Sequence, residues 1–263
     1  MRSYRRAAVA STFSPNFHAL LAEADSFARH LGAGLDLVHA SAPDRDKAQR
    51  FQEALDELKS PAAVRWAQGE TPSQAILQEV QDGGYDLLIA GALERETTLD
   101  GRSFTGSVAR ALLAEAPCDL LLLPKPVDVW TPPVRAALAL EPGDDVKRFV
   151  LPIMESLGLK SLTLAVAETP FAAAIAASRG EEAMNVGSWL DDVASSLEGH
   201  GFEIETRLVN SNTGFALCDA IQGVEADLLL AQIVRSKNGR TALPAHLGWL
   251  HQVIPCRLWV VVD

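Results

Sequence analysis

The chain has 263 residues, 48% of them hydrophobic and 22% charged, which is typical of a globular protein with one large domain or two of ordinary size. Its net charge of −11 argues against nucleic acid as a partner, because phosphates would be repelled overall. No apolar run reaches the roughly 20 residues of a membrane-spanning helix, so no membrane partner is expected.

The first residues, "MRSYRRAAVASTF", combine basic side chains with a short apolar segment. That segment is too short for a signal peptide and runs into polar Ser11, Thr12 and Ser14. We therefore interpret it as a strand and expect a cytoplasmic protein. The three cysteines lack CxxC spacing, which argues against a zinc ribbon or a redox pair and favours buried structural thiols.

Short apolar runs alternate with longer amphipathic ones up to residue 124. The apolar runs predict strands at Arg6–Ser11, Gly34–Ala40, Ala62–Ala67, Asp86–Gly91 and Asp119–Pro124. The amphipathic stretches predict helices at Pro15–Leu31, Asp44–Leu58, Thr71–Val80 and Thr105–Ala116. Near-continuous apolar strands separated by helices indicate an α/β fold with a doubly wound parallel sheet.

The rest of the chain repeats this order after Lys125–Pro133, whose three prolines suit a linker. Strands are predicted near Val134–Leu140, Ser161–Ala165, Glu203–Val209, Asp227–Ala231 and Arg257–Val262. The extra stretch Glu168–Asn185 displaces the second helix of this half. A surface helix and an ordered insertion both remain open for it.

Sequence similarity between the halves indicates a duplication. "YDLLIAG" at Tyr85–Gly91 resembles "ADLLLAQ" at Ala226–Gln232, and each is followed by a predicted helix, Pro-Cys and an apolar strand. The helix expected at Leu243–Cys256 thus corresponds to the one at Thr105–Ala116. We predict two tandem domains, residues 1–126 and 133–263, packed as an internal pseudo-dimer that covers their sheet edges. A further homo-oligomer remains open.

A ligand site is expected where the carboxyl ends of the first-half strands converge. Loops there carry Ser11, Thr12, His39, Ala40 and Gly91. In "FTGSVARALLAEAPC" (Phe104–Cys118), Gly106 allows close backbone approach, Ser107 offers a hydroxyl, and the amides of Ser107 and Val108 lie at a helix start that favours anions. The alternative is that Thr105 or Ser107 merely caps the helix.

"VASTFSPNFHALLAEADSFARHLGAGLDLVHA" (Val9–Ala40), "GETPSQAI", "DLLIAG" and "GSVARALLAEAPCDLLLLP" (Gly106–Pro124) resemble the universal stress protein family. The second half resembles it more distantly. This resemblance implies two five-stranded parallel sheets of order 3-2-1-4-5, dimer-like pairing, and in many members a bound ATP. The family's nucleotide pattern is Gly, two residues, Gly, nine residues, then Gly followed by Ser or Thr.

The match to that pattern is partial. Gly91 and Gly106-Ser107 fit, but Glu94 replaces the second glycine, and eleven residues, Arg95 to Thr105, precede Gly106. Thr12 stands where the family has an acid facing adenosine. In the second half, Pro244-Ala245 replaces Gly-Ser and removes an amide and a hydroxyl. We therefore expect ATP, if it binds, in the first domain only.

No catalytic residue or metal site is predicted, because the sequence holds no HxxxH pair, nucleophile elbow or Walker-type loop. His39 is expected to be a structural histidine at the solvent edge, and the alternative is that it contacts the base of a ligand. Three hypotheses follow: a non-catalytic stress-response module that binds adenine nucleotide, a nucleotide-independent scaffold for a protein partner, and, least favoured, a slow nucleotide hydrolase.

Overall fold

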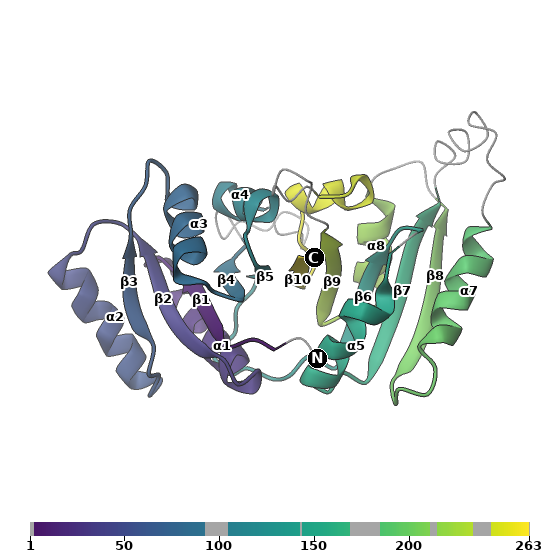
Figure 1. Cartoon of the computed structure of the whole chain (residues 1–263), viewed down its shortest axis with the longest axis horizontal. Helices are drawn as coiled ribbons and strands as arrows, with labels where there is room; N and C mark the ends of the chain where they lie inside the picture. The colour runs from purple at the N-terminus through teal and green to yellow at the C-terminus, as the bar shows by residue number, and fades with distance from the viewer. Residues whose placement is uncertain are drawn as a thin grey trace.

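The computed structural model describes residues 3–92, 105–142, 144–168, 185–210, 215–233 and 243–262. Its described strands form one sheet of ten, with helices on both faces (Figure 1). The strands of the first half are β1 (Arg6–Ala10), β2 (Gly34–Ala40), β3 (Ala63–Ala67), β4 (Leu87–Gly91) and β5 (Asp119–Leu123). Those of the second half are β6 (Arg135–Leu140), β7 (Ser161–Glu168), β8 (Glu203–Asn210), β9 (Leu228–Ile233) and β10 (Arg257–Val262).

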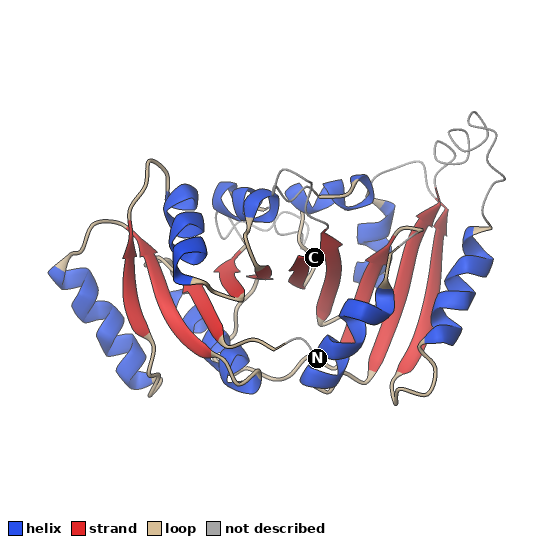
Figure 2. Cartoon of the chain, in the orientation of Figure 1, coloured by secondary structure: helices blue, strands red, loops and turns tan. Residues whose placement is uncertain are grey.

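The helices alternate with these strands along the chain (Figure 2). The first half contributes α1 (Phe17–His30), α2 (Arg45–Glu57), α3 (Pro72–Gly83) and α4 (Ser107–Glu115). The second half contributes α5 (Val146–Leu157), α7 (Val186–Ser196), α8 (Ala216–Gly223) and the 3-10 helix η1 (Ala245–His251). In the parts of the chain that the structure describes, no helix is long and apolar enough to cross a membrane.

The strand order is β3-β2-β1-β4-β5-β10-β9-β6-β7-β8. Each half therefore has the predicted order 3-2-1-4-5, with all pairs inside a half parallel. The halves meet through β5 and β10, which pair antiparallel with Trp259 opposite Leu121. The predicted tandem doubly wound fold and its pseudo-dimeric packing are confirmed, and the two sheets are fused edge to edge.

Two hydrophobic cores fill the space between this sheet and its helices. Helices α1, α2, α5 and α7 pack on one face, and α3, α4, α8 and η1 pack on the other. Strand residues alternate between the cores, as Leu87 and Ile89 against Leu88 show. Because both faces are covered, the central strands are near-continuous apolar runs that the sequence reveals to within a few residues. The edge strands β3 and β8 instead alternate largely between exposed and partly buried residues.

One carboxylate in each half fixes the start of that half's first strand. Asp86 accepts hydrogen bonds from the amides of Arg5 (2.8 Å) and Arg6 (3.0 Å). Asp227 accepts them from the amides of Val134 (3.1 Å) and Arg135 (2.9 Å). The repeated contact makes Arg6 and Arg135 equivalent positions, which sets the alignment of the two halves.

Buried polar and aromatic contacts hold the halves together. Asp119 accepts from the Tyr4 hydroxyl at 2.6 Å and from the Val262 amide at 2.9 Å. Trp259 is fully buried, with its ring 5.5 Å from the Tyr4 ring and 6.1 Å from the Phe27 ring. This tryptophan of the second half therefore packs in the core and also contacts two residues of the first half.

One expected helix is wrong, and one expected segment lies mostly outside the described residues. The helix expected at Leu243–Cys256 is instead the short 3-10 helix η1, in which the Leu247 amide donates to the Pro244 carbonyl at 2.9 Å. Gly248, in the middle of this segment, disfavours an α-helix. The extra stretch Glu168–Asn185 lies outside the described residues except for its two ends.

Candidate functional site

The carboxyl edge of the first half brings the end of β4 to the start of α4. The Gly106 amide donates to the Ala92 carbonyl at 2.8 Å, so Gly91, at the end of β4, lies beside the helix start. Gly106 is the N-cap residue of α4, and no side chain caps the helix. The first-turn amides, including those of Ser107 and Val108, have no acceptor inside the helix and are available to an anion.

Thr105 does not cap α4, contrary to the simpler interpretation of this sequence. Its amide donates to the Gln252 carbonyl at 3.0 Å, and its hydroxyl donates to the Leu250 carbonyl at 2.9 Å. Ser107 is exposed and provides no cap either. Thr105 instead attaches the loop before α4 to η1 of the other half. Glu94 and most of the loop Arg95–Thr105 lie outside the described residues.

At the ends of β1 and β2, the structure brings Ser11 and His39 together. His39 is buried, and its Nδ1 hydrogen-bonds the Ser11 carbonyl at 2.8 Å. A carbonyl can only accept, so Nδ1 carries a proton. Within the described structure, His39 Nε2 and Ser11 Oγ are buried without a hydrogen-bond partner. Thr12, the next residue, is exposed.

An aromatic cluster surrounds His39, which corrects the expectation of a histidine at the solvent edge. Its ring lies 5.0 Å from the Phe51 ring and 5.6 Å from the Trp66 ring. Phe13 stacks on Phe51 at 4.3 Å, and the Arg50 guanidinium lies over the outer side of Phe13 at 4.0 Å. These contacts close the side of the edge that faces α1 and α2 and support a structural role for His39.

A cavity of about 310 Å³ opens on the other side of the same edge. It is bounded by the residues after β2, those after β3, and the start of α3, where the Thr71 hydroxyl accepts from the Gln74 amide at 3.2 Å. Ala40 lines this cavity, whereas the other predicted ligand residues do not. The sequence did not suggest this part of the edge. In the described residues, no group of histidine, cysteine and carboxylate side chains is arranged to hold a metal ion.

The first half also matches a known family at the level of sequence. Residues 49–124 match the model of the universal stress protein family, and they include β3, β4, α4 and most of the edge described above. This part of the first half is therefore similar in sequence to the universal stress proteins. No curated protein sequence matches the chain.

Solved structures share the fold of the entire chain. A protein of unknown function from Pseudomonas aeruginosa is 14% identical, with a TM-score of 0.68 over 99% of this chain and 93% of its own. A universal stress protein from Archaeoglobus fulgidus is 13% identical, with a TM-score of 0.65 over 98% of each chain. Sequence identities this low support the shared tandem fold and say nothing about a shared function.

The second unit of the chain, residues 133–263, has a different edge. Glu141 is equivalent to Thr12, since each lies six positions beyond the matched arginines Arg135 and Arg6. His246, in η1, donates from Nδ1 to Glu141 at 3.0 Å. The Glu141 amide donates to Asp144 at 2.9 Å, and burial raises the pKa of Asp144 above its ordinary value.

Sequence reasoning missed this Glu141 cluster because its members are up to 105 residues apart. The signal that could have found it is the carboxylate directly after β6, at the position where the family usually has an acid. His246 follows Pro244 and Ala245, the residues that replace Gly106 and Ser107 of the first unit. Negative charge at this edge disfavours a phosphate there.

Proposed function

We propose that this chain is a non-catalytic stress-response module whose first unit binds an adenine nucleotide weakly. The observation that carries the proposal is the uncapped start of α4, which the Gly106–Ala92 hydrogen bond holds beside the end of β4. The proposal assigns residues 1–126 to the binding unit and 133–263 to a degenerate partner. The proposed nucleotide contacts are Ser11, Thr12, Ala40, Gly91, Gly106, Ser107 and Val108.

The balance of charges at this edge argues for weak binding. Free amides and the helix dipole at a helix start contribute up to about 2 kcal/mol toward a partly buried anion. Against this stand the carboxylate of Glu94 in the same loop sequence, a hydroxyl at Thr12 in place of an acid, and the net charge of −11. The favourable and unfavourable contributions are of similar size, so we expect ATP to bind weakly.

The first experiment is to denature the purified protein and analyse any released ligand by ultraviolet absorbance and mass spectrometry. Calorimetry with ATP should then give a stoichiometry near one per chain. Two equivalent sites would contradict the assignment of the second unit as degenerate.

Substitutions give the binding test a direction. Gly106→Val should abolish binding, because a branched side chain at the N-cap blocks backbone approach to a phosphate. Glu94→Gly should strengthen binding by removing a negative charge. Ala245→Val, at the corresponding helix start of the second unit, is the matched control and should leave binding unchanged. If neither first-unit substitution changes ATP affinity, the anion site is wrong.

The alternative function is a nucleotide-independent scaffold for a protein partner, favoured by the Glu141–His246 contact that fills the second edge. Complete absence of bound or titratable nucleotide, with the fold intact, would select it. Steady turnover of ATP by the purified chain would instead select the third hypothesis, a slow hydrolase. The described residues offer no metal-binding carboxylate group for that chemistry.

A further inference from the structure

A compact polar cluster fills the space beneath α3 at the amino end of the first unit's strands. The Asp36 carboxylate accepts from the Tyr85 hydroxyl at 2.8 Å, from Arg65 Nε at 3.3 Å and from Arg6 at 3.4 Å. The Arg6 guanidinium also lies over the Tyr85 ring at 4.6 Å. One carboxylate and one phenol ring therefore occupy the space between two arginine side chains.

The backbone of the first unit is adapted to that ring. Gly83 ends α3, and a Cβ atom there would overlap the Tyr85 ring edge. Gly84, between them, has a φ of +61°, a left-handed conformation that glycine adopts readily. The Gly-Gly-Tyr sequence is thus a unit in which two glycines accommodate one aromatic side chain.

In the second unit, the carboxylate and the ring are both missing. Strand register pairs Ala8 with Asp36 in the first unit and Ala137 with Thr163 in the second, so Thr163 stands at the position of Asp36. Ala226, directly before the strand-fixing Asp227, stands at the position of Tyr85. A threonine and an alanine leave most of that space empty.

Both arginines are nevertheless retained. Arg135 corresponds to Arg6. In the first unit Ala63 pairs with Asp36, and Arg65 lies two positions further along β3. In the second unit Glu205 pairs with Thr163, and Arg207 lies two positions further along β8. Val224 takes the place of Gly83, as expected where no ring lies over it. The second unit therefore keeps the two arginines of the cluster and lacks the carboxylate and the phenol ring between them.

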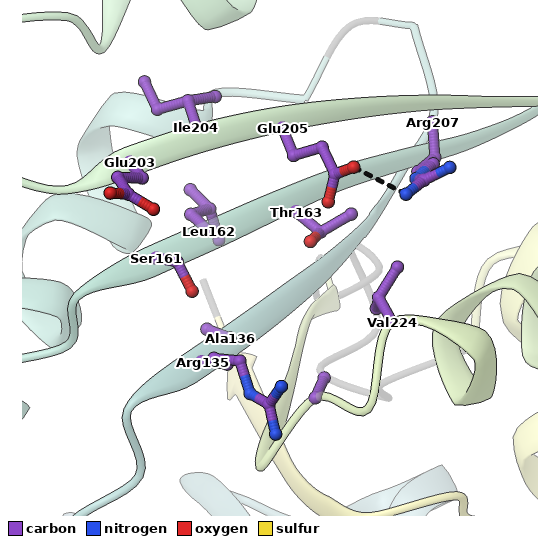
Figure 3. A pocket seen from close by; sticks show the side chains of 11 residues that line it. Arg135, Ala136, Ser161, Leu162, Thr163, Glu203, Ile204, Glu205, Arg207 and Val224 are labelled. Carbon is purple, nitrogen blue, oxygen red and sulfur yellow. Dashed lines mark hydrogen bonds and ion pairs between the residues drawn. The ribbon is translucent and has the colours of Figure 1, made fainter.

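The vacated space is a cavity of about 330 Å³ (Figure 3). Its polar lining includes Arg135, Ser161, Thr163 and Arg207, and Val224 contributes apolar surface. These side chains come from β6, β7, β8 and the end of α8, and in Figure 3 they surround one open space. The cavity lies near the amino ends of the strands, at the opposite edge of the sheet from the proposed nucleotide site.

Among the described residues, the guanidinium groups of both arginines pair only with exposed carboxylates. Arg207 contacts Glu205 at 2.5 Å, and Arg135 contacts Glu225 at 3.6 Å. All four side chains are about half exposed or more, and ion pairs of that kind contribute about 0–1 kcal/mol. A ligand carboxylate can therefore compete for both guanidinium groups. Glu203 and Glu205 at the rim disfavour ligands with several negative charges, such as nucleotides.

We propose that this cavity binds a small aromatic monocarboxylate that replaces the missing Asp36 and Tyr85 groups. The carboxylate lies between Arg135 and Arg207 and accepts a hydrogen bond from the Thr163 hydroxyl. The ring lies against Val224 and Ala226, where the first unit has its phenol. The site is independent of the proposed nucleotide function and uses none of its residues.

The direct test is titration of the full chain with 4-hydroxybenzoate, by calorimetry or ligand-observed NMR. We expect saturable binding of one molecule per chain, with a Kd of about 1 mM or tighter for a ligand of this size. The neutral analogue 4-hydroxybenzamide and the ringless anion acetate should each bind at least tenfold more weakly. Equal binding of the acid and its amide would overturn the proposal.

Charge substitutions test the two arginines. Arg135→Gln and Arg207→Gln should each weaken 4-hydroxybenzoate binding at least tenfold, with the circular dichroism spectrum unchanged. Lys147→Gln, an exposed lysine in α5 on the opposite face of the sheet, removes the same charge and should leave affinity unchanged. If both arginine variants bind as the unsubstituted chain does, the assignment is wrong.

The first unit supplies the design for a filled cavity. The triple variant Thr163→Asp, Val224→Gly, Ala226→Tyr rebuilds the first-unit cluster and should abolish binding while the chain remains folded. Conversely, Asp36→Thr with Tyr85→Ala should open a second site and raise the stoichiometry toward two. A folded triple variant that binds with unchanged affinity would overturn the proposal, and if that variant does not fold, the arginine series decides alone.

Discussion

Glu23 and Arg257 form a buried ion pair that joins the first unit of the chain to the last strand of the second. The Glu23 side chain, on α1, is 1% exposed and that of Arg257, at the start of β10, is 18% exposed. Glu23 also accepts from the Val127 amide at 2.9 Å, in the segment between the units. A single carboxylate thus connects a helix, the connecting segment and the strand that fuses the sheets.

Removing Glu23 should destabilise the chain strongly. Glu23→Ala leaves the Arg257 guanidinium largely buried without its partner, and breaking such a pair costs about 3–5 kcal/mol. Chemical denaturation should show the loss as a lower free energy of unfolding. The double variant Glu23→Leu, Arg257→Leu removes both charges and should recover much of that stability. A Glu23→Ala variant within 0.5 kcal/mol of the unsubstituted chain, on the order of an ordinary surface change, would contradict this.

Asp36 should make the stability of the first unit sensitive to acid. Burial raises the pKa of Asp36, but the Tyr85 hydrogen bond and the charge of Arg65 outweigh it and hold the pKa below its ordinary value of 3.8. The folded state therefore favours the ionised form. The resulting stability is fully present above the unfolded pKa and is lost as the pH falls through the lower folded pKa.

The measurement compares the free energy of unfolding of the unsubstituted chain and Asp36→Asn between pH 6 and pH 2.5. The difference between them should shrink as the pH falls below about 4. Tyr85→Phe removes one of the interactions that lower the pKa, so its pH dependence should be shallower. A difference that stays constant over the whole range would contradict the assignment.

The phenol of Tyr85 should ionise unusually late. Burial, followed by the hydrogen bond to Asp36, raises its pKa to about 12. Folding thus favours the protonated phenol, and this stability is present below the unfolded pKa of 10.0 and is lost as the pH rises toward 12. The chain has only two tyrosines, so ultraviolet titration of Tyr4→Phe reports Tyr85 alone. Ionisation near pH 10 in the folded state would refute the prediction, and Asp36→Asn should lower the midpoint.

Glu225 is strained in the backbone position that Gly84 occupies in the first unit. Its φ is +50°, in the left-handed region that costs a side-chain-bearing residue about 1–2 kcal/mol. Glu225→Gly should therefore be more stable than Glu225→Ala by about 1 kcal/mol. Both variants lose the same carboxylate, so the comparison isolates the backbone. Equal thermal midpoints for the two would show that the strain is relieved elsewhere.

Much of the fold could be predicted because buried parallel strands appear in the sequence as near-continuous apolar runs. Gly34–Ala40 and Arg257–Val262 agree with the observed strands at both ends. The prediction of η1 as an α-helix was wrong because it rested on similarity to α4. The corresponding residues include Gly248 and lack the alanines that favour α4.

The candidate sites were less predictable, since they depend on contacts between distant residues. Gly106 and Ser107 could be selected from a local pattern, and the structure then revealed that no side chain caps their helix. The Asp36–Tyr85 hydrogen bond spans 49 residues, and its loss at Thr163 and Ala226 becomes visible only through strand register. Ordinary threonine and alanine carry no sequence signal for a cavity.

The antiparallel pairing of β5 with β10 has a consequence for how this protein can change. Two subunits that meet through separate chains part on dilution, whereas here the partner is tethered and its effective concentration is fixed by the connecting segment. The thermal midpoint should accordingly be independent of protein concentration. Because the two edges are encoded separately in one chain, a substitution in one edge is not repeated in the other. A fused pair can thus hold two dissimilar sites in every molecule, a ratio that mixing identical subunits cannot guarantee.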